Sequence, residues 1–422
     1  MAEESILTDD FLRELINVGE VDILIGVPTY NDAATVGQVV QAVRAGLVEY
    51  FPRERAVIVN VDGGSRDATR DLVRAASISD LQRVSDLHAL RTLHSISARY
   101  AGDPAPGTAL HAILTAADLL RAHACAVISP SSANIQPEWI NQLLRPVCRE
   151  NADLVTPVYC RNKFDGLLVR NLLYPMTRAL YGRRLREPHP AEFAFSGRLG
   201  NHLLAQDIWS QEIGQIGAET YLVIQAVTGG FRLAQSFLGP KLRIDQAAAD
   251  LVKALRQSVG VLFWALQQHP LASATNGESQ PIPTNGPEHQ VSVEPVRVNR
   301  KRLYQGFTHG VAELEPVLSS ILSARTLAEL RRAATLAEDD FRYSDELWAS
   351  TVYEFAASYH KAVISRDHIV QALAPLYRGR AYTFLVENRD AKGEEVEANV
   401  EALCQTFERL RPHLLEVWDG GK

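Results

Sequence analysis

The first 160 residues alternate short apolar runs with amphipathic segments, and this alternation constrains the fold more than any other feature. The apolar runs are VDILIGVPTY (21–30), RAVIVNVD (55–62), ALRTLHSIS (89–97), ACAVISP (124–130) and DLVTPVYC (153–160). The stretches between several of these runs place apolar residues at the 3.6-residue spacing of a helix. Strands that alternate with helices predict an α/β fold, in which a mostly parallel sheet is covered by helices on both faces.

Polar turns follow three of the predicted strands. They read PTYND (28–32), DGGSRD (62–67) and SPSSAN (129–134). In open α/β sheets, ligands bind beyond the carboxyl ends of the strands. The sequence therefore predicts that the functional site lies at the edge where these turns meet.

The remainder of the chain divides into three further kinds of sequence. A helix–strand pair lies in AETYLVIQAVTGGFRLAQSFLG, and a helical pattern follows to about residue 268. Residues 268–299 are rich in Pro, Gly, Ser and Asn, which is typical of a flexible linker or long surface loop. Residues 300–422 have an almost entirely helical pattern. We therefore expect an α/β domain over 1–260, a linker over 268–299 and a helical domain over 300–422.

Charge and composition exclude several classes of protein. The formal net charge is −7, which argues against a sequence-independent nucleic-acid binder, because neutralising phosphates needs clustered Lys and Arg. The four cysteines are scattered without a CxxC pair, so neither a zinc site nor a disulfide framework is expected. The sequence has no signal-peptide pattern and no apolar run of about 18 residues. We expect a cytoplasmic protein without a membrane span.

Several motifs, taken in order, resemble one enzyme family. They are IGVPTYNDAATVGQVV, NVDGGSRDAT, the stretch from RNKFDG to EFAFSG, GAET and FLGPKLRID. Together they resemble the family 2-like glycosyltransferases with the GT-A nucleotide-sugar-binding fold, nearest the bacterial mannosylglycerate and glucosylglycerate synthase-like group. The resemblance covers about residues 20–260 and, more loosely, 300–418. It implies transfer of a hexose from a nucleotide sugar to a small polar, glycerate-like acceptor, and it makes a homodimer one expected oligomeric state.

The resemblance also assigns roles at the first two turns. Pro28, Thr29, Tyr30 and Asn31 would line the pocket for the base, and Asp62 would accept hydrogen bonds from the uracil or ribose. Gly63 and Gly64 would allow close approach of the backbone to the ligand. A structural alternative explains the same sequence, because Asn31 or Asp32 and Ser65 are also typical N-caps of the helices that follow.

The chain departs from the family pattern at the positions that hold a divalent metal. The Asp-x-Asp of the family falls on Ser129, Pro130 and Ser131, and its metal-binding histidine falls on Arg243. Serine hydroxyls are uncharged and a guanidinium cannot bind a metal, so we expect no metal cofactor. The Lys or Arg with which the resembled family usually binds the diphosphate is also missing here, near Ala105–Pro106.

Two acids of the family pattern remain. Glu192 would act as a general base or would accept a hydrogen bond from a sugar hydroxyl, and Glu219 would lie near the acceptor substrate.

Two functional hypotheses stay open. In the first, the enzyme is metal-independent, with Ser129 and Ser131 in the binding loop and fixed cations stabilising the diphosphate. The candidate cations are Arg161, Lys163, Lys241 and Arg243, of which Arg243 would be catalytic. In the second, the chain is a pseudoenzyme that binds a ligand or serves as a scaffold. Arg161, Lys163 and Asp165 also fit a surface salt-bridge cluster.

Overall fold

The structure is a computed structural model that describes residues 6–78, 93–241, 250–269, 278–286 and 298–420. The chain forms two compact units that interleave along the sequence. The first comprises Met1–Cys160, Pro190–Ala248 and Ile282–Val291, and the second comprises Arg161–His189, Ala249–Pro281 and Ser292–Lys422. The expected boundary at residue 260 thus falls inside a segment of the second unit.

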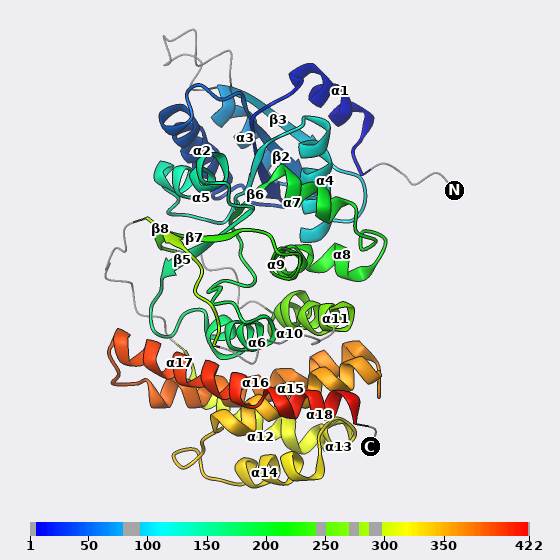
Figure 1. Cartoon of the computed structure of the whole chain (residues 1–422), viewed down its shortest axis with the longest axis vertical. Helices are drawn as coiled ribbons and strands as arrows, with labels where there is room; N and C mark the ends of the chain where they lie inside the picture. The colour runs from blue at the N-terminus through cyan, green and yellow to red at the C-terminus, as the bar shows by residue number, and fades with distance from the viewer. Residues whose placement is uncertain (1–5, 79–92, 242–249, 270–277, 287–297, 421–422) are drawn as a thin grey trace. The chain divides into compact units, whose positions relative to one another are not determined.

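Among the described residues, the first unit is built on one eight-stranded sheet, with strand order β3-β2-β1-β4-β6-β5-β7-β8 (Figure 1). Of these eight strands, only β6 runs antiparallel to its neighbours β4 and β5, and the other paired strands are parallel. The predicted mostly parallel α/β sheet is therefore confirmed. The strands are β1 Ile23–Thr29, β2 Ala56–Asp62, β3 Leu93–Arg99, β4 Ala124–Val127, β5 Leu154–Cys160, β6 Phe193–Ser196, β7 Leu233–Pro240 and β8 Thr284–Asn285.

The register of the parallel strands places their last residues at one edge of the sheet. Thr29 pairs with Asp62, and Asp62 pairs with Arg99 across the next strand. On the other half of the sheet, Cys160 pairs with Pro240. This carboxyl-terminal edge therefore carries the turns that the sequence analysis singled out.

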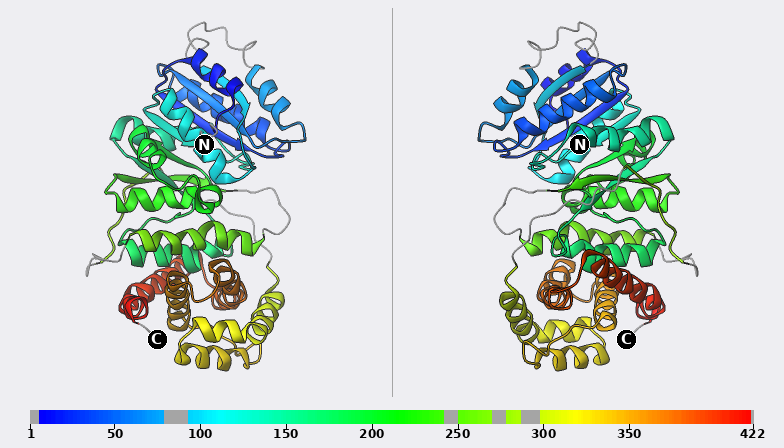
Figure 2. Two further views of the ribbon diagram at one scale, coloured as in Figure 1. Left: turned by 90° about the vertical axis from the view of Figure 1, so that its right-hand side faces the viewer. Right: turned by 90° about the vertical axis from the view of Figure 1, so that its left-hand side faces the viewer.

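Helices cover both faces of this sheet (Figures 1 and 2). On one face, α2 Val36–Tyr50, α3 Thr69–Ile78 and α5 Pro137–Glu150 bury their apolar residues against β1, β2 and β4. On the other face lies α4 Pro106–Leu119, with α7 Gly197–Leu204, α8 Glu212–Ile216 and α9 Ala218–Thr228 packed against it, while α1 Asp9–Val18 contacts β3. The approach of α4 is close, because a Cβ on Gly26 would lie 2.6 Å from the side chain of Ile113.

The second unit is predominantly helical. Its elements are η2 Val169–Leu173, α6 Tyr174–Tyr181, α10 Leu251–Leu255, η3 Arg256–Gly260, α11 Val261–Gln268, α12 Arg300–Glu313, α13 Glu315–Ile321, α14 Ala324–Ala334, α15 Asp345–Lys361, α16 Arg366–Glu387, α17 Gly393–Arg409 and α18 Arg411–Asp419. The predicted C-terminal helical region is therefore present. Its core holds large buried aromatic side chains, among them Trp348, Tyr343 and Phe307.

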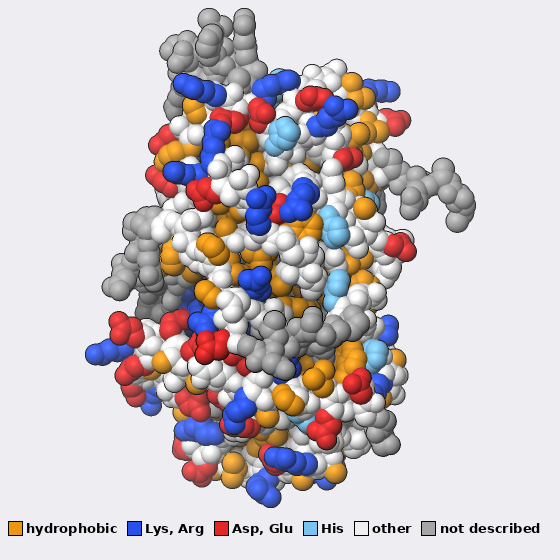
Figure 3. Space-filling model, in the orientation of Figure 1, with side chains coloured by type: hydrophobic (Ala, Val, Ile, Leu, Met, Phe, Trp, Pro, Cys, Tyr) orange, Lys and Arg blue, Asp and Glu red, His pale blue; other side chains and the backbone are white. Residues whose placement is uncertain are grey.

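The stretch that the sequence suggests as a linker, 268–299, lies partly outside the described residues. Within the described part, Thr284 pairs with Gln235 and extends the sheet as β8, and Ile282 is buried. Acidic and basic side chains are interspersed over the face shown in Figure 3. None of the described helices is both long enough and apolar enough to cross a membrane.

Candidate functional site at the carboxyl-terminal edge of the sheet

Five parallel strands deliver polar or charged residues to the same edge of the first unit. Thr29 and Asp62 end β1 and β2, the Ser129–Ser131 loop follows β4, Tyr159 lies near the end of β5, and Lys241 follows β7. Because β6 runs in the opposite direction, the residue before it, Glu192, lies at this edge as well. Such an edge is where α/β sheets bind ligands.

Asp62 organises the turn after β2. Its side chain is fully buried. Oδ2 accepts hydrogen bonds from the backbone N–H groups of Gly64 at 3.0 Å and Ser65 at 2.9 Å. Oδ1 accepts from the hydroxyls of Ser65 at 2.6 Å and Thr29 at 3.1 Å. Both carboxylate oxygens are therefore engaged within the protein, and Asp62 fixes the position of the Gly63–Gly64 turn relative to β1.

The turns after β1 and β2 are locked to each other. Asn31 adopts a positive φ of 60°, which Asn tolerates better than most residues. Its N–H donates to Ser65 Oγ at 2.9 Å, and its Oδ1 accepts from the Arg66 N–H at 2.9 Å. The Asp32 N–H donates to Thr69 Oγ1 at 2.8 Å. These contacts join two loops, whereas α2 and α3 begin only at Val36 and Thr69, so helix capping alone does not account for the side-chain contacts of these turns.

The two glycines of the second turn are approached by side chains of this chain. A Cβ on Gly63 would lie 2.9 Å from the Tyr100 hydroxyl and 2.9 Å from Pro104, and one on Gly64, whose φ is +90°, would lie 3.2 Å from the Arg99 guanidinium. Arg99 is exposed and Tyr100 is buried. The sequence analysis missed both residues, although their place two and three residues after the third predicted strand (89–97) was a signal that they belong to this edge.

The loop after β4 presents hydroxyl groups. Ser129 Oγ and Ser131 Oγ lie 2.9 Å apart and share a hydrogen bond. Mg²⁺ is usually held in proteins by one or two carboxylates together with substrate phosphates and waters. The Ser129–Ser131 loop supplies neutral hydroxyls and no carboxylate.

Glu192 and Lys241 form a buried ion pair beside this loop. The Lys241 Nζ lies 2.6 Å from Glu192 Oε2, and the side chains are 2% and 0% exposed, respectively. Tyr159 donates to the same oxygen, and Ser132 donates to Oε1. Burial would raise the pKa of Glu192, but the charge and hydrogen bond of Lys241 outweigh that effect and lower the pKa. Glu192 is therefore an ionised carboxylate whose two oxygens are held by the protein.

Glu219 has the opposite environment. It lies in the first turn of α9, and its Oε2 is buried without a hydrogen-bond partner among the described residues. Burial raises the pKa of this carboxyl to about 7. Within the described part of the chain, no hydrogen bond or ion pair joins Glu219 to Glu192. The two acids that the sequence singles out thus differ in protonation: one is ionised and paired, and the other holds its proton close to neutral pH.

The remaining candidate cations belong to the second unit or are not described. In the second unit, Arg161 is 10% exposed and bonds to Glu187 at 2.6 Å and Asp165 at 3.4 Å. Lys163 donates to the backbone carbonyls of Arg389 at 2.6 Å and Ala391 at 3.0 Å. Arg161 therefore belongs to a largely buried salt-bridge cluster rather than to the surface cluster considered from the sequence. Arg243 lies outside the described residues.

No family model and no curated protein sequence matches the chain. Solved structures of glucosyl-3-phosphoglycerate synthase from Mycobacterium tuberculosis are similar to it. One of these structures has 22% identity over 60% of this chain and 84% of that chain, with a TM-score of 0.43. The complex with Mn²⁺, UDP-glucose and phosphoglyceric acid has 20% identity over 63% of this chain and 86% of that chain, with a TM-score of 0.42. At these TM-scores, the similarity carries no argument about substrate, metal or mechanism.

Proposed function

We propose that this chain binds a nucleotide sugar at the carboxyl-terminal edge of its sheet and transfers the hexose to a small polar, glycerate-like acceptor. The observation that carries the proposal is the convergence on that edge of two interlocked polar turns, the Ser129–Ser131 hydroxyl loop and the buried Glu192–Lys241 pair. The motif resemblance, read from the same residues, supports it. The fold supplies the edge, and these side chains supply the chemistry.

The nucleoside half of the donor is assigned to the turns after β1 and β2. Tyr30 is 49% exposed, so its ring is accessible for stacking on a base, beside Pro28, Thr29 and Asn31. Because both oxygens of Asp62 are engaged by the protein, its proposed role is to hold Gly63 and Gly64 in place rather than to bind the ribose directly. The exposed Arg99 adds a cation at this turn.

The diphosphate half is assigned to the Ser129–Ser131 loop, without a metal. The two hydroxyls would donate neutral hydrogen bonds to phosphate oxygens. Lys241 adds no net charge, since Glu192 neutralises it. Positive charge therefore has to come from guanidinium groups, with Arg99 and the sequence-assigned Arg243 as candidates.

The proton of the acceptor hydroxyl is assigned to Glu219. In the transfer, the bond between the anomeric carbon and the diphosphate oxygen breaks, the acceptor oxygen bonds to that carbon, and the hydroxyl proton must leave. A general base is most effective when its pKa lies near the working pH and its oxygen is not already bonded. Glu219 lies in the first turn of α9, and the residues just before α9 lie against the start of α4, where a Cβ on Gly107 would be 2.0 Å from the Gly214 carbonyl oxygen. With a pKa of about 7, Glu219 meets these conditions better than Glu192, whose proposed role becomes the positioning of Lys241 and Tyr159.

A second candidate function is binding without catalysis. The observation that favours it is that the carboxylate oxygens of Glu192 and Asp62 all accept hydrogen bonds from other groups of the protein. A chain that keeps the edge as an internal network could retain the nucleotide and never turn it over. Slow hydrolysis of the bound donor separates the two candidates, because only the enzyme releases free sugar.

A thermal-shift panel of UDP-, GDP- and ADP-sugars, each with Mn²⁺ and with EDTA, tests the binding proposal. A ligand at about 100 times its Kd stabilises the folded state by roughly 2.7 kcal/mol, which is easily measured. We expect one nucleotide class to raise the Tm equally in Mn²⁺ and EDTA. A shift that depends on Mn²⁺ would contradict the metal-free site, and no shift with any donor would contradict nucleotide-sugar binding.

A further inference from the structure

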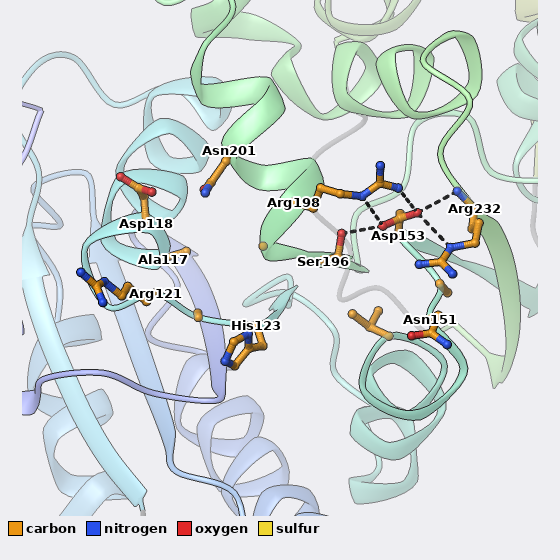
Figure 4. Close-up of a pocket in the computed structure, with 14 residues that line it drawn as sticks. Ala117, Asp118, Arg121, His123, Asn151, Asp153, Ser196, Arg198, Asn201 and Arg232 are labelled. Atoms are coloured by element: carbon orange, nitrogen blue, oxygen red, sulfur yellow. Dashed lines mark hydrogen bonds and ion pairs between the residues drawn. The ribbon is translucent and has the colours of Figure 1, made fainter.

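A pocket with a volume of about 430 Å³ lies at the edge of the sheet opposite to the candidate site. It opens where β4, β5 and β7 begin and where β6 ends, so its walls include His123, Asp153, Arg232 and Arg198. Figure 4 shows Arg198 and Arg232 on either side of Asp153, with Arg121 and His123 across the pocket. No role has been given to this pocket by the function proposed above.

Asp153 is the centre of one wall, and two arginines share its charge. Its side chain is 2% exposed. It accepts from Arg198 Nη2 at 2.6 Å and Nε at 3.3 Å, from Arg232 Nε at 3.4 Å, and from the Ser196 hydroxyl at 2.9 Å. Burial would raise the pKa of Asp153, but the hydrogen bonds from Arg198, the Arg232 backbone and Ser196 outweigh it and lower the pKa. One carboxylate thus faces two guanidiniums, which leaves a positive charge.

The guanidiniums keep donors for a ligand. A guanidinium has five N–H groups, and Asp153 uses the Nε and Nη2 side of Arg198 and the Nε of Arg232. The side chains of Arg198 and Arg232 are 63% and 62% exposed, so their remaining N–H groups are accessible. Buried Asp153 holds both in fixed orientation, which lowers the entropy lost when an anion binds.

The opposite wall adds a third guanidinium. Arg121 pairs with Glu20 at 2.9 Å, but these side chains are 79% and 66% exposed, and such exposed pairs are weak enough to be exchanged for a better partner. The lining contains three arginines and two aspartates, and Glu20 neutralises Arg121. The positive charge of the pocket is therefore concentrated at Arg198 and Arg232, which share the single carboxylate of Asp153.

We propose that this pocket is a binding site for a small phosphomonoester, with the phosphate group held by Arg198 and Arg232. Guanidinium groups bind phosphate through paired, charge-assisted hydrogen bonds. The pocket volume exceeds that of a phosphate ion and leaves space for a short polyol or sugar body, which the polar wall of Asp118, Asn201 and His123 would contact. The site is independent of the nucleotide-sugar proposal.

Isothermal titration of the full chain with ribose 5-phosphate and with inorganic phosphate, at ionic strength matched with NaCl, tests this site. We expect saturable binding, tighter for ribose 5-phosphate, and a loss of about tenfold or more in Arg198→Gln. Because Arg198→Gln removes a partner of buried Asp153, Arg198→Lys serves as a second variant that keeps a cation beside Asp153 but loses the paired N–H groups of the guanidinium, with a loss of several-fold expected. Arg74→Gln, which removes an exposed charge on α3, is the matched control and should bind as the wild type does.

Three results would overturn the proposal. The first is the absence of saturable binding of either probe at millimolar concentration. The second is an equal Kd in the wild type, Arg198→Lys and Arg198→Gln, which would place any bound phosphate elsewhere on the chain. The third is a Kd for ribose 5-phosphate no lower than that for inorganic phosphate, which would show that the pocket does not recognise the sugar part of a phosphomonoester.

Discussion

Lys241 Nζ lies 2.6 Å from Glu192 Oε2, and the two side chains are almost completely removed from solvent. They come from segments 49 residues apart in sequence, one immediately before β6 and one immediately after β7. The pair therefore ties together two strands that are not neighbours in the sheet, at the edge where the proposed substrate binds. Glu192 also accepts hydrogen bonds from Tyr159 of β5 and from Ser132 in the loop after β4, so the pair connects these segments as well.

Replacing Glu192 with Gln should destabilise the fold as well as reduce transfer. Removing one partner of a buried ion pair leaves the other charge uncompensated and costs about 3–5 kcal/mol. Urea unfolding followed by circular dichroism measures this. Glu150→Gln is the control, since its pair with Arg145 is 65% and 46% exposed and such pairs contribute about 0–1 kcal/mol. A loss below about 1 kcal/mol in Glu192→Gln would contradict the pairing.

Glu219 should make stability fall with rising pH. Its pKa is raised from 4.5 to about 7 in the folded state, so the folded state binds more protons than the unfolded state between these values. The contribution of this protonation to the free energy of unfolding is fully present below about pH 4.5. It is lost as the pH rises through about 7, and the loss amounts to roughly 3 kcal/mol. Urea midpoints from pH 5 to 8 should therefore decline in the wild type and decline less in Glu219→Gln, whose amide carries no charge. Parallel curves would show that Glu219 does not titrate in this range.

Tyr30→Ala should weaken the nucleotide without weakening the fold. The ring is 49% exposed, so little packing is lost, whereas an aromatic stacking contact contributes about 0.5–1.5 kcal/mol. Titration calorimetry should show a loss of several-fold in affinity for the nucleoside diphosphate and for the nucleoside alike. The control is Ile16→Ala, which removes an exposed side chain of α1 (76% exposed). Unchanged affinity in Tyr30→Ala would remove the turn after β1 from the binding site.

Gly310→Ala should destabilise the second unit through overpacking. A Cβ at this position would lie 2.2 Å from the Cβ of Pro375, so α12 and α16 would have to separate, which typically costs about 1–3 kcal/mol. Gly393→Ala, at the start of α17, is the matched control, because no heavy atom lies within 4 Å of its added Cβ and alanine has the higher helix propensity. Thermal unfolding of both variants distinguishes them. Equal Tm values would contradict the close packing of α12 and α16.

The strands of the first unit could be predicted because their signal is local. Buried strands in a parallel sheet are continuous apolar runs, and each run is followed by a turn with Gly, Asn or Asp. The same reasoning located the turns at 28–32 and 62–67 and the loop at 129–131. It also placed the helical region after residue 300, where the periodicity is strong.

The contacts between distant segments could not be predicted. Nothing near Glu192 in the sequence indicates that Lys241 neutralises it, and nothing near Thr284 indicates that a two-residue strand adds to β7. The interleaving of residues 161–189 and 249–281 into the second unit follows from packing rather than from composition. Arg99 lies two residues beyond the predicted strand 89–97 and is the last residue of β3, but its contact with Gly64 depends on the register of β2 and β3.

The most direct test of the central claim is a transfer assay read by mass spectrometry. The purified chain is incubated in EDTA with UDP-, GDP- or ADP-hexose and with glycerate, and the products are compared with those of Glu219→Gln. The account predicts a hexosyl-glycerate product and free nucleoside diphosphate from one donor class, insensitive to EDTA and strongly reduced in Glu219→Gln. If no donor yields either a glycosylated acceptor or free sugar, with or without Mn²⁺, the proposed transferase function is contradicted.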